Sequence, residues 1–198
     1  MALFGKVFKK SKDDIDQEYE DALAFLNSDE KQNKVLPSDI AERVLSGEDC
    51  DQISGGSGEF GRSATNPIPC NGPIGEWTYL SRLRLRSTGD MVFFHRLQQL
   101  DGGVDLFELV STSGQFVDHL YLHMYHPRKS RLCPQGYILQ YELINPRGIL
   151  EYSPDFPAGL FKQIAKACKK YLGLKAGEQR ANYINLEVAQ KSLSEYNS

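Results

Sequence analysis

Residues 91–126 read MVFFHRLQQLDGGVDLFELVSTSGQFVDHLYLHMYH, and this stretch decides the fold class. Apolar and polar residues alternate along three runs, which is the pattern of half-buried β-strands. Short turn sequences, DGG and SG, separate the runs. Because such short turns join antiparallel neighbours, the stretch predicts an antiparallel meander. Its strands are expected at residues 91–97, 104–112 and 115–126.

The predicted meander extends in both directions along the chain. Residues 77–86 also alternate, and the turn sequence STGD at 87–90 leads from them into the next strand. Downstream, residues 136–144 supply a further apolar run, which the sequence NPRG at 145–148 closes. We therefore expect a sheet of about five antiparallel strands.

Helical periodicity is found on both sides of this sheet. Apolar residues follow helical spacing up to about residue 27, and a short second helix is expected from Ser38 or Asp39 to a stop at Gly47. Residues 158–172 and 178–194 are predicted to form the C-terminal helices. Because helices and strands occur in separate blocks, the sequence indicates an α+β fold with N-terminal and C-terminal helices packed on one sheet face.

Glycine and proline divide the chain between residues 47 and 76. Residues 48–58 are acidic and rich in Gly and Ser, so we expect a mobile linker there, although GSGEFG at 56–61 matches a nucleotide-binding pattern literally. No strand precedes those glycines and prolines follow them, which argues against nucleotide binding. Residues 62–76 are expected to be an ordered Pro-rich loop. The predicted parts of one domain are a helical segment (1–46), a Gly-rich linker (47–61) and an α+β body (62–198).

Composition and charge exclude several classes of protein. The chain has 198 residues, 40% of them hydrophobic and 25% charged, and no apolar run approaches the roughly 20 residues of a membrane-spanning helix. A net charge of −3 argues against non-specific DNA coating. Residues 1–59 contain 7 basic and 14 acidic residues, whereas the remainder contains 16 and 12. We expect these parts to complement one another within one molecule, or between the two copies of a homodimer.

The cysteines and the N-terminal residues bear on the compartment. None of the four cysteines forms a C-x-x-C pair, and no signal-peptide pattern is found, so we expect reduced thiols in a cytoplasmic protein. Residues 1–12 combine four lysines with Phe and Val; we expect a frayed end there and leave a peripheral membrane contact open.

No metal or cofactor site is predicted. His119 and His123 would lie roughly 13 Å apart on one strand face, too far for one metal ion, with His126 on the opposite face. In the strand expected at residues 115–126, alternate residues from Val117 to Tyr125 form a polar aromatic face. We expect this face either to line a ligand site or to be covered by helices. Asp118 would point inward and need a partner, for which His95 and Arg96 are candidates.

Two polar loops, the one before residue 77 and the one after His126, define the candidate site. Loops held by a rigid sheet often carry function, so the sequence favours a non-catalytic binding or protein-interaction domain. Its partner is expected to be an unknown protein or a small anionic ligand. The residues expected to supply the polar contacts are Arg62, Asn71, Glu76, His95, Tyr125, His126, Arg128 and Arg131.

Two alternatives remain open at this stage, and whether the chain is an enzyme is undecided. Cys70 could act as a nucleophile with His95 or His126 as base and Asp118 as orienter, in a small hydrolase or transferase. A ridge of arginines could instead bind nucleic acid or another anionic ligand, although few aromatic residues lie along it. The ridge would consist of Arg82, Arg84, Arg86 and Arg96, together with Arg128, Lys129 and Arg131 in the loop after His126. It could also accept the acidic N-terminal segment of the same chain or of a neighbouring copy.

Overall fold

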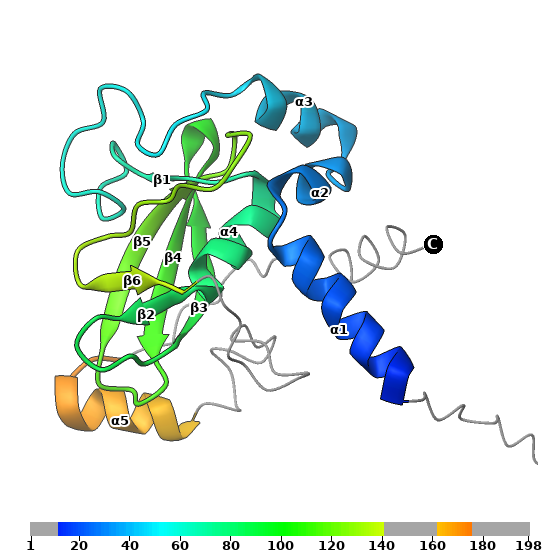
Figure 1. Ribbon diagram of the computed structural model, residues 1–198. Helices are drawn as coiled ribbons and strands as arrows, with labels where there is room; N and C mark the ends of the chain where they lie inside the picture. The colour runs from blue at the N-terminus through cyan, green and yellow to red at the C-terminus, as the bar shows by residue number, and fades with distance from the viewer. Residues whose placement is uncertain (1–11, 141–161, 176–198) are drawn as a thin grey trace, which may run out of the picture.

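The computed structural model describes residues 12–140 and 162–175 (Figure 1). Its central element is a four-stranded sheet in the order β1-β5-β4-β3, beside a two-stranded sheet of β2 and β6. The strands are β1 (Ile68–Pro69), β2 (Leu83–Leu85), β3 (Val92–Gln99), β4 (Val104–Ser111), β5 (Val117–His123) and β6 (Tyr137–Leu139). The helices are α1 (Lys12–Leu26), α2 (Asp29–Lys34), α3 (Ser38–Ser46), α4 (Gly72–Ser81) and α5 (Lys162–Leu172), with a short 3-10 helix η1 (Asp101–Gly103).

The α+β class is confirmed, but the antiparallel meander of five strands is wrong. β3, β4 and β5 are successive antiparallel neighbours, as their short turns predict. β1 pairs with β5 in parallel, so the main sheet is mixed. β2 and β6 form an antiparallel pair in a separate sheet. The parallel pairing joins segments about fifty residues apart, which local turn sequences do not encode.

Residues 77–81, expected to begin the first strand, belong to helix α4. Pro73 lies in the first turn of this helix, where its fixed φ and missing N–H are tolerated. The buried positions follow helical spacing. Because two of them are glycines and one is a carboxylic acid, the pattern of hydrophobic residues in the sequence does not show the helical period. This buried stripe contains Gly72, Gly75, Glu76, Tyr79 and Leu80.

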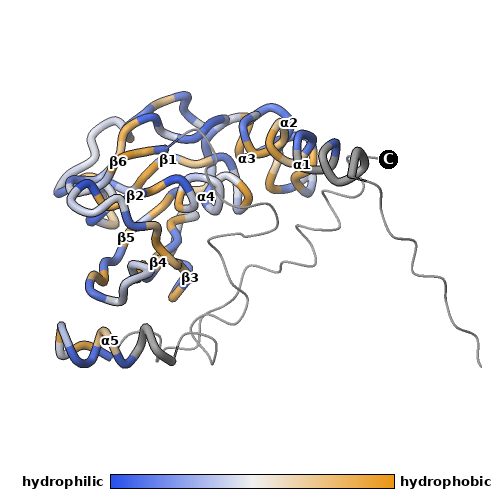
Figure 2. The backbone as a smooth tube through the Cα atoms, turned by 60° about the horizontal axis from the view of Figure 1, so that its bottom comes forward, coloured by the Kyte–Doolittle hydropathy of each residue, from blue (hydrophilic) through white to orange (hydrophobic). Residues whose placement is uncertain are grey.

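Helices lie against both faces of the main sheet, not against one face as expected. One face packs against α4 and the β2–β6 pair and forms the main core. On the other face, Cys168 of α5 packs against Val110, with Phe93 and Val117 around it. Hydrophobic and hydrophilic residues alternate along the turns of α5 (Figure 2). The residues that the four-stranded sheet contributes to the main core are Ile68, Val92, Phe94, Phe107, Leu109, Leu120 and Leu122.

The N-terminal helices α2 and α3 gather beside the start of α4, and α1 extends away from them (Figure 1). The prediction for α3 is confirmed, since it begins at Ser38 and is capped by Gly47. α2 was not predicted because its sequence, DEKQNK, has no apolar residue. It begins where the Ser28 hydroxyl accepts a hydrogen bond from the Lys31 N–H (3.2 Å), a standard N-cap.

The segment expected to be a mobile linker, residues 48–58, runs along the body and bonds to it. The Ser57 N–H donates to the Thr65 carbonyl (3.2 Å), and the Ser130 hydroxyl donates to the Asp51 carbonyl (2.6 Å). These bonds tie the segment to the Pro-rich loop and to the loop after His126. The acidic side chains of the segment are thereby brought next to basic residues of the body.

Several predictions concern residues outside the described ranges. These are the helix at 178–194, the start of the helix at 158–161, the end of the fifth strand at 141–144 and the N-terminal residues 1–11. Within residues 12–140 and 162–175, no helix has both the length and the apolar character that crossing a bilayer requires.

Gly102 and Gly103, neighbours in the turn between β3 and β4, give a matched test of packing. Both have positive φ angles, of 78° and 92°. A Cβ atom on Gly102 would meet nothing within 4 Å, whereas one on Gly103 would lie 2.1 Å from Cε2 of Tyr125. We expect Gly103→Ala to lower the free energy of unfolding, measured in urea, by about 1–3 kcal/mol more than Gly102→Ala does. Equal losses in the two variants would contradict the close packing of Tyr125.

Candidate functional site

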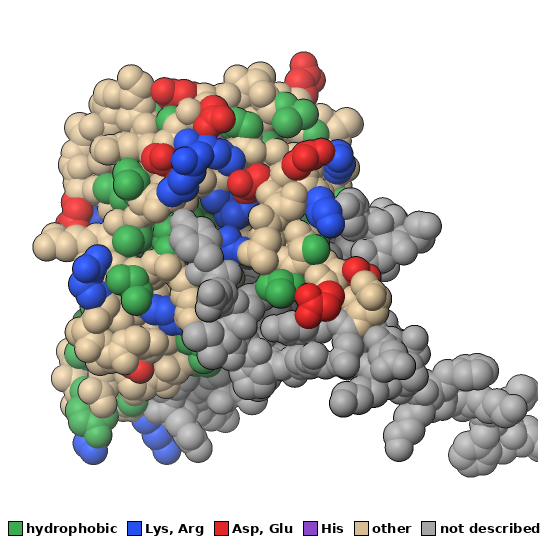
Figure 3. All heavy atoms as spheres, viewed as in Figure 1, with side chains coloured by type: hydrophobic (Ala, Val, Ile, Leu, Met, Phe, Trp, Pro, Cys, Tyr) green, Lys and Arg blue, Asp and Glu red, His purple; other side chains and the backbone are tan. Residues whose placement is uncertain are grey.

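A cavity of about 300 Å³ opens between the α1–α2 turn, the end of α4, the loop at 128–131 and β6. Four of its lining residues are cationic and one is acidic. Figure 3 shows basic side chains clustered on this face with acidic side chains around them. The lining residues are Asn27, Asp29, Tyr79, Arg82, Arg128, Lys129, Ser130, Arg131 and Leu139.

Arg128 binds the acidic segment that precedes the Pro-rich loop. Its Nε lies 2.5 Å from Oδ1 of Asp49, and its Nη1 lies 2.5 Å from Oδ1 of Asp51. These contacts raise the pKa of Arg128, and the hydrogen bond from Arg128 lowers the pKa of Asp51. Asp51 also accepts a hydrogen bond from the Arg131 backbone N–H (2.9 Å). The expected complementarity between the acidic N-terminal part and the basic body is therefore present within one molecule.

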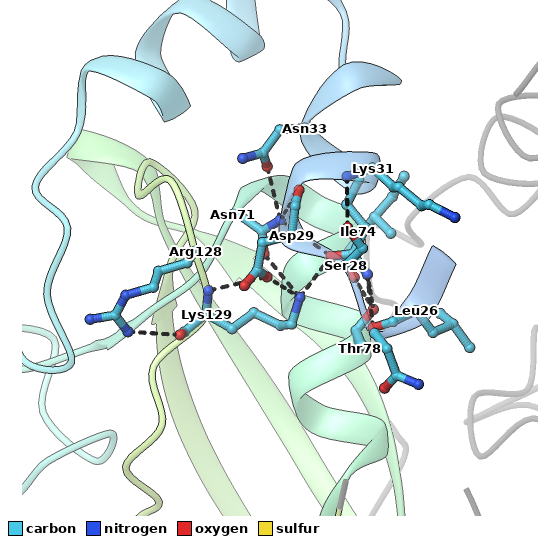
Figure 4. A network of polar contacts seen from close by, with 12 residues as sticks. Leu26, Ser28, Asp29, Lys31, Asn33, Asn71, Ile74, Thr78, Arg128 and Lys129 are labelled. Atoms are coloured by element: carbon cyan, nitrogen blue, oxygen red, sulfur yellow. Dashed lines mark hydrogen bonds and ion pairs between the residues drawn. The ribbon is translucent and has the colours of Figure 1, made fainter. Parts of the chain in front are cut away.

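Lys129 points inward from the same loop and is held in a buried polar network (Figure 4). Its side chain is 8% exposed and contacts the Asp29 carboxylate. Its ammonium also donates to Oε1 of Gln32 (2.8 Å) and to Oδ1 of Asn71 (3.3 Å). Burial lowers the pKa of Lys129, and Asp29 opposes this effect. Three N–H groups facing three oxygens match the protonated form of the side chain.

Amide side chains extend this network between α2 and the start of α4. Nδ2 of Asn71 donates to Oδ1 of Asn33 (2.9 Å) and to Oε1 of Gln32 (3.2 Å). Nε2 of Gln32 donates to the Thr78 hydroxyl (3.1 Å), and Nδ2 of Asn33 donates to the Pro127 carbonyl (2.8 Å). The network therefore positions the wall of the cavity, since it fixes α2, α4 and the loop against one another.

Sequence reasoning missed Lys129, Asp29 and Gln32 as members of the candidate site. Lys129 lies 100 residues from Asp29 and 97 from Gln32 along the chain. A polar helix and a basic loop are both typical of solvent-exposed segments, so no local signal identified these contacts. The one indication in the sequence that Lys129 belongs to the site is its position between Arg128 and Arg131, which were both predicted site residues.

Arg62, another predicted contact residue, lies away from the cavity and binds Asp118. Its Nη2 lies 2.8 Å from Oδ2 of Asp118, which also accepts a hydrogen bond from the Tyr137 hydroxyl (3.0 Å). Asp118 does point toward the core face, but Arg62 is its partner in place of the expected His95 or Arg96. Burial, followed by the charge of Asp118, raises the pKa of Tyr137.

His95 and Glu76, also predicted as contact residues, are enclosed in the protein. Nε2 of His95 lies 2.7 Å from Oε1 of Glu108, on the sheet face that α5 contacts. Glu76 of α4 is 0% exposed, and the charges of Asp105 and Arg96 act on its carboxyl group in opposite directions. Burial raises the pKa of Glu76 well above its usual range, and the charge of Asp105 raises it further.

Tyr125 and His126, the last two predicted contact residues, form a cluster with Arg43 and His123. None of these four residues lines the cavity. The Arg43 guanidinium lies over the Tyr125 ring at 3.5 Å and donates to its hydroxyl (2.6 Å). His126 comes after the end of β5, so it lies beside His123 and not on the opposite strand face; Nδ1 of His123 and Nε2 of His126 are 2.7 Å apart. Burial lowers the pKa of both histidines. Within the described ranges, no three His, Cys, Asp or Glu side chains are grouped so as to hold a metal ion.

Cys70, the candidate nucleophile, is completely buried, and all four cysteines are free thiols. Burial raises the pKa of the Cys70 thiol well above its usual range. His126 contacts Cys70 through backbone atoms, since the His126 N–H donates to the Cys70 carbonyl (3.1 Å). A buried thiol with a raised pKa is a poor nucleophile, so this geometry does not favour the hydrolase alternative.

The predicted arginine ridge is not a continuous surface. Arg82 follows α4 and donates to the Leu26 carbonyl (3.0 Å), whereas Arg84 donates to the Ser81 carbonyl (2.7 Å). Arg96 is paired with Asp105 at 2.8 Å. The guanidinium groups of Arg82, Arg84 and Arg96 thus bond to three separate parts of the protein.

Of the eight predicted site residues, Arg128 and Arg131 line the cavity, and Asn71 supports it through the buried network. The other five lie elsewhere. No protein-family model matches the chain, and comparisons with curated proteins and with solved structures found no significant match.

Proposed function

We propose that the protein is a non-catalytic binding module whose cavity holds the anionic group of a small ligand. The observation that carries this proposal is Arg131. Its side chain lines the cavity, and its guanidinium makes no hydrogen bond or ion pair with any residue in the described ranges. An exposed guanidinium fork beside a cavity suits bidentate recognition of a carboxylate or a phosphate.

The balance of charge supports an anionic ligand. Among the described residues, the cavity and the aspartates bound to Arg128 together carry four cationic groups and three carboxylates. Lys129 and Arg128 are paired with carboxylates of the protein, and Arg82 donates to the Leu26 carbonyl. Arg131 acts on Asp51 through its charge, and its guanidinium is placed to meet a ligand. Tyr79 and Leu139 provide apolar surface for the remainder of a small molecule.

The same lining favours binding over catalysis. The described lining residues include neither histidine nor cysteine, and the one carboxylate among them, that of Asp29, is bound to Lys129. A nucleophile with a neighbouring base, the usual basis of covalent catalysis, is therefore not assembled by these residues.

Calorimetric titration tests the proposal with inorganic phosphate, succinate and a nucleoside monophosphate at low salt. At least one of these anions is expected to bind, and Arg131→Gln is expected to weaken that binding by about tenfold, because a charge-assisted hydrogen bond is lost. Arg86→Gln removes an exposed arginine that does not line the cavity and is the matched control. The proposal fails if none of the anions binds, or if the two variants bind equally.

A further inference from the structure

Helix α5 and the residues after it carry a dense positive charge. Residues 162–175 contain five lysines and no acidic residue. Lys166, Lys169, Lys170 and Lys175 are all exposed. By helical geometry, Lys166 and Lys170 lie on the side of α5 away from Cys168, which faces the sheet, and Lys169 lies on the flank between the two sides. The charge is therefore presented to solvent.

Apolar side chains are exposed at the C-terminal end of the same helix. Tyr171 and Leu172 are three and four residues beyond Cys168, so they lie on the same side of the helix as this buried residue. Even so, Tyr171 is 56% exposed and Leu172 is 38% exposed. Leu174, just after the helix, is 48% exposed. The apolar side of α5 thus continues past the part that the sheet covers.

We propose that this end of α5 is a docking surface for an anionic lipid bilayer. Lysines beside exposed leucines and a tyrosine are the combination that binds at a membrane interface, because the cations meet anionic headgroups while the apolar groups enter the acyl boundary. Figure 3 shows basic and apolar side chains together over α5, at the end of the molecule.

The exposed apolar groups distinguish this surface from one for nucleic acid. A phosphate backbone is neutralised by lysines alone, and that contact leaves Leu172 and Leu174 in water. An anionic bilayer binds the lysines through its headgroups and also removes the apolar side chains from water. The cavity proposed to bind small anions lies in another part of the protein, between the α1–α2 turn and the loop at 128–131, so the two proposals are independent.

Sedimentation with lipid vesicles tests the docking surface on the full chain. Vesicles of phosphatidylcholine containing about 30% phosphatidylserine are expected to bind the protein, and vesicles of phosphatidylcholine alone are not. Lys169→Glu with Lys170→Glu is expected to weaken binding by about thirtyfold or more, and added salt should weaken it also. Leu174→Asp, outside the helix, is expected to weaken binding without changing the helical circular dichroism signal.

Lys31→Glu with Lys34→Glu makes the same change of charge on α2 and is expected to leave vesicle binding unchanged. The proposal is overturned if anionic vesicles do not bind, if neutral vesicles bind equally, or if both double variants lose the same affinity. It is also overturned if Lys9→Glu with Lys10→Glu abolishes binding while the α5 variants bind normally. Retention on heparin without vesicle binding would indicate nucleic acid and would equally overturn it.

Discussion

Replacing Lys129 with methionine is expected to lower the free energy of unfolding by about 3–5 kcal/mol. Methionine keeps the length and the apolar stem of the side chain but removes the ammonium group. The Asp29 carboxylate, Oε1 of Gln32 and Oδ1 of Asn71 then lose the donor that they share. Buried polar groups without partners carry their full desolvation penalty, so the loss exceeds that of one ordinary hydrogen bond. Urea denaturation at neutral pH measures it.

Lys34→Met is the matched control, because Lys34 is an exposed lysine of α2 that pairs with Glu30 at 2.6 Å. Lys34→Met is expected to lower the free energy of unfolding by less than about 1 kcal/mol, as is usual when an exposed ion pair is removed. Asp29→Asn, combined with Lys129→Met, should recover part of the lost stability by removing the unpaired carboxylate. If Lys129→Met costs no more than Lys34→Met, the network is not organised around the cation.

The parts of the fold that were predicted correctly are those set by neighbouring residues. The alternation and short turns of residues 91–126 locate β3, β4 and β5, and Gly47 marks the end of α3. β1 and α4 were missed for physical reasons. β1 is held by a partner strand about fifty residues away, and the buried side of α4 contains glycines and Glu76 in place of apolar residues.

The candidate site was predicted only in part, for similar reasons. The charge asymmetry between the two ends of the chain anticipated ion pairs within the molecule, and the loop after His126 was correctly connected with them. The identity of the pairs, such as Arg128 with Asp49 and Asp51, depends on tertiary structure. Polar residues such as Glu76 and His95 were expected at the surface because their chemistry favours water, and the structure encloses them instead.

Glu76 and Asp105 place two carboxyl groups near the guanidinium of Arg96 in the protein interior. Arg96 donates to Oδ2 of Asp105 at 2.8 Å. Among the described residues, the oxygens of Glu76 and Oδ1 of Asp105 have no hydrogen-bond donor other than a proton shared between these two carboxyl groups. Desolvation raises the pKa of both acids, and the charge of Asp105 raises that of Glu76 further. Two carboxylates so close to one another disfavour double ionisation, so we infer that Glu76 holds a proton at neutral pH.

Glu76→Gln is therefore expected to raise the free energy of unfolding by about 2–4 kcal/mol near pH 8 and to leave it almost unchanged near pH 4. The folded pKa of Glu76 lies above its unfolded value, so the folded state binds a proton that the unfolded state has released. Stability of the natural protein must then fall as pH rises from about 4.3 toward the folded pKa. Glutamine does not titrate, and its amide can donate to Oδ1 of Asp105 at every pH. Urea denaturation across this range, with the exposed Glu42→Gln as control, should show the two curves diverging as pH rises. A constant difference between them would mean that the pKa of Glu76 is the same in the folded and the unfolded protein, and it would contradict the inference.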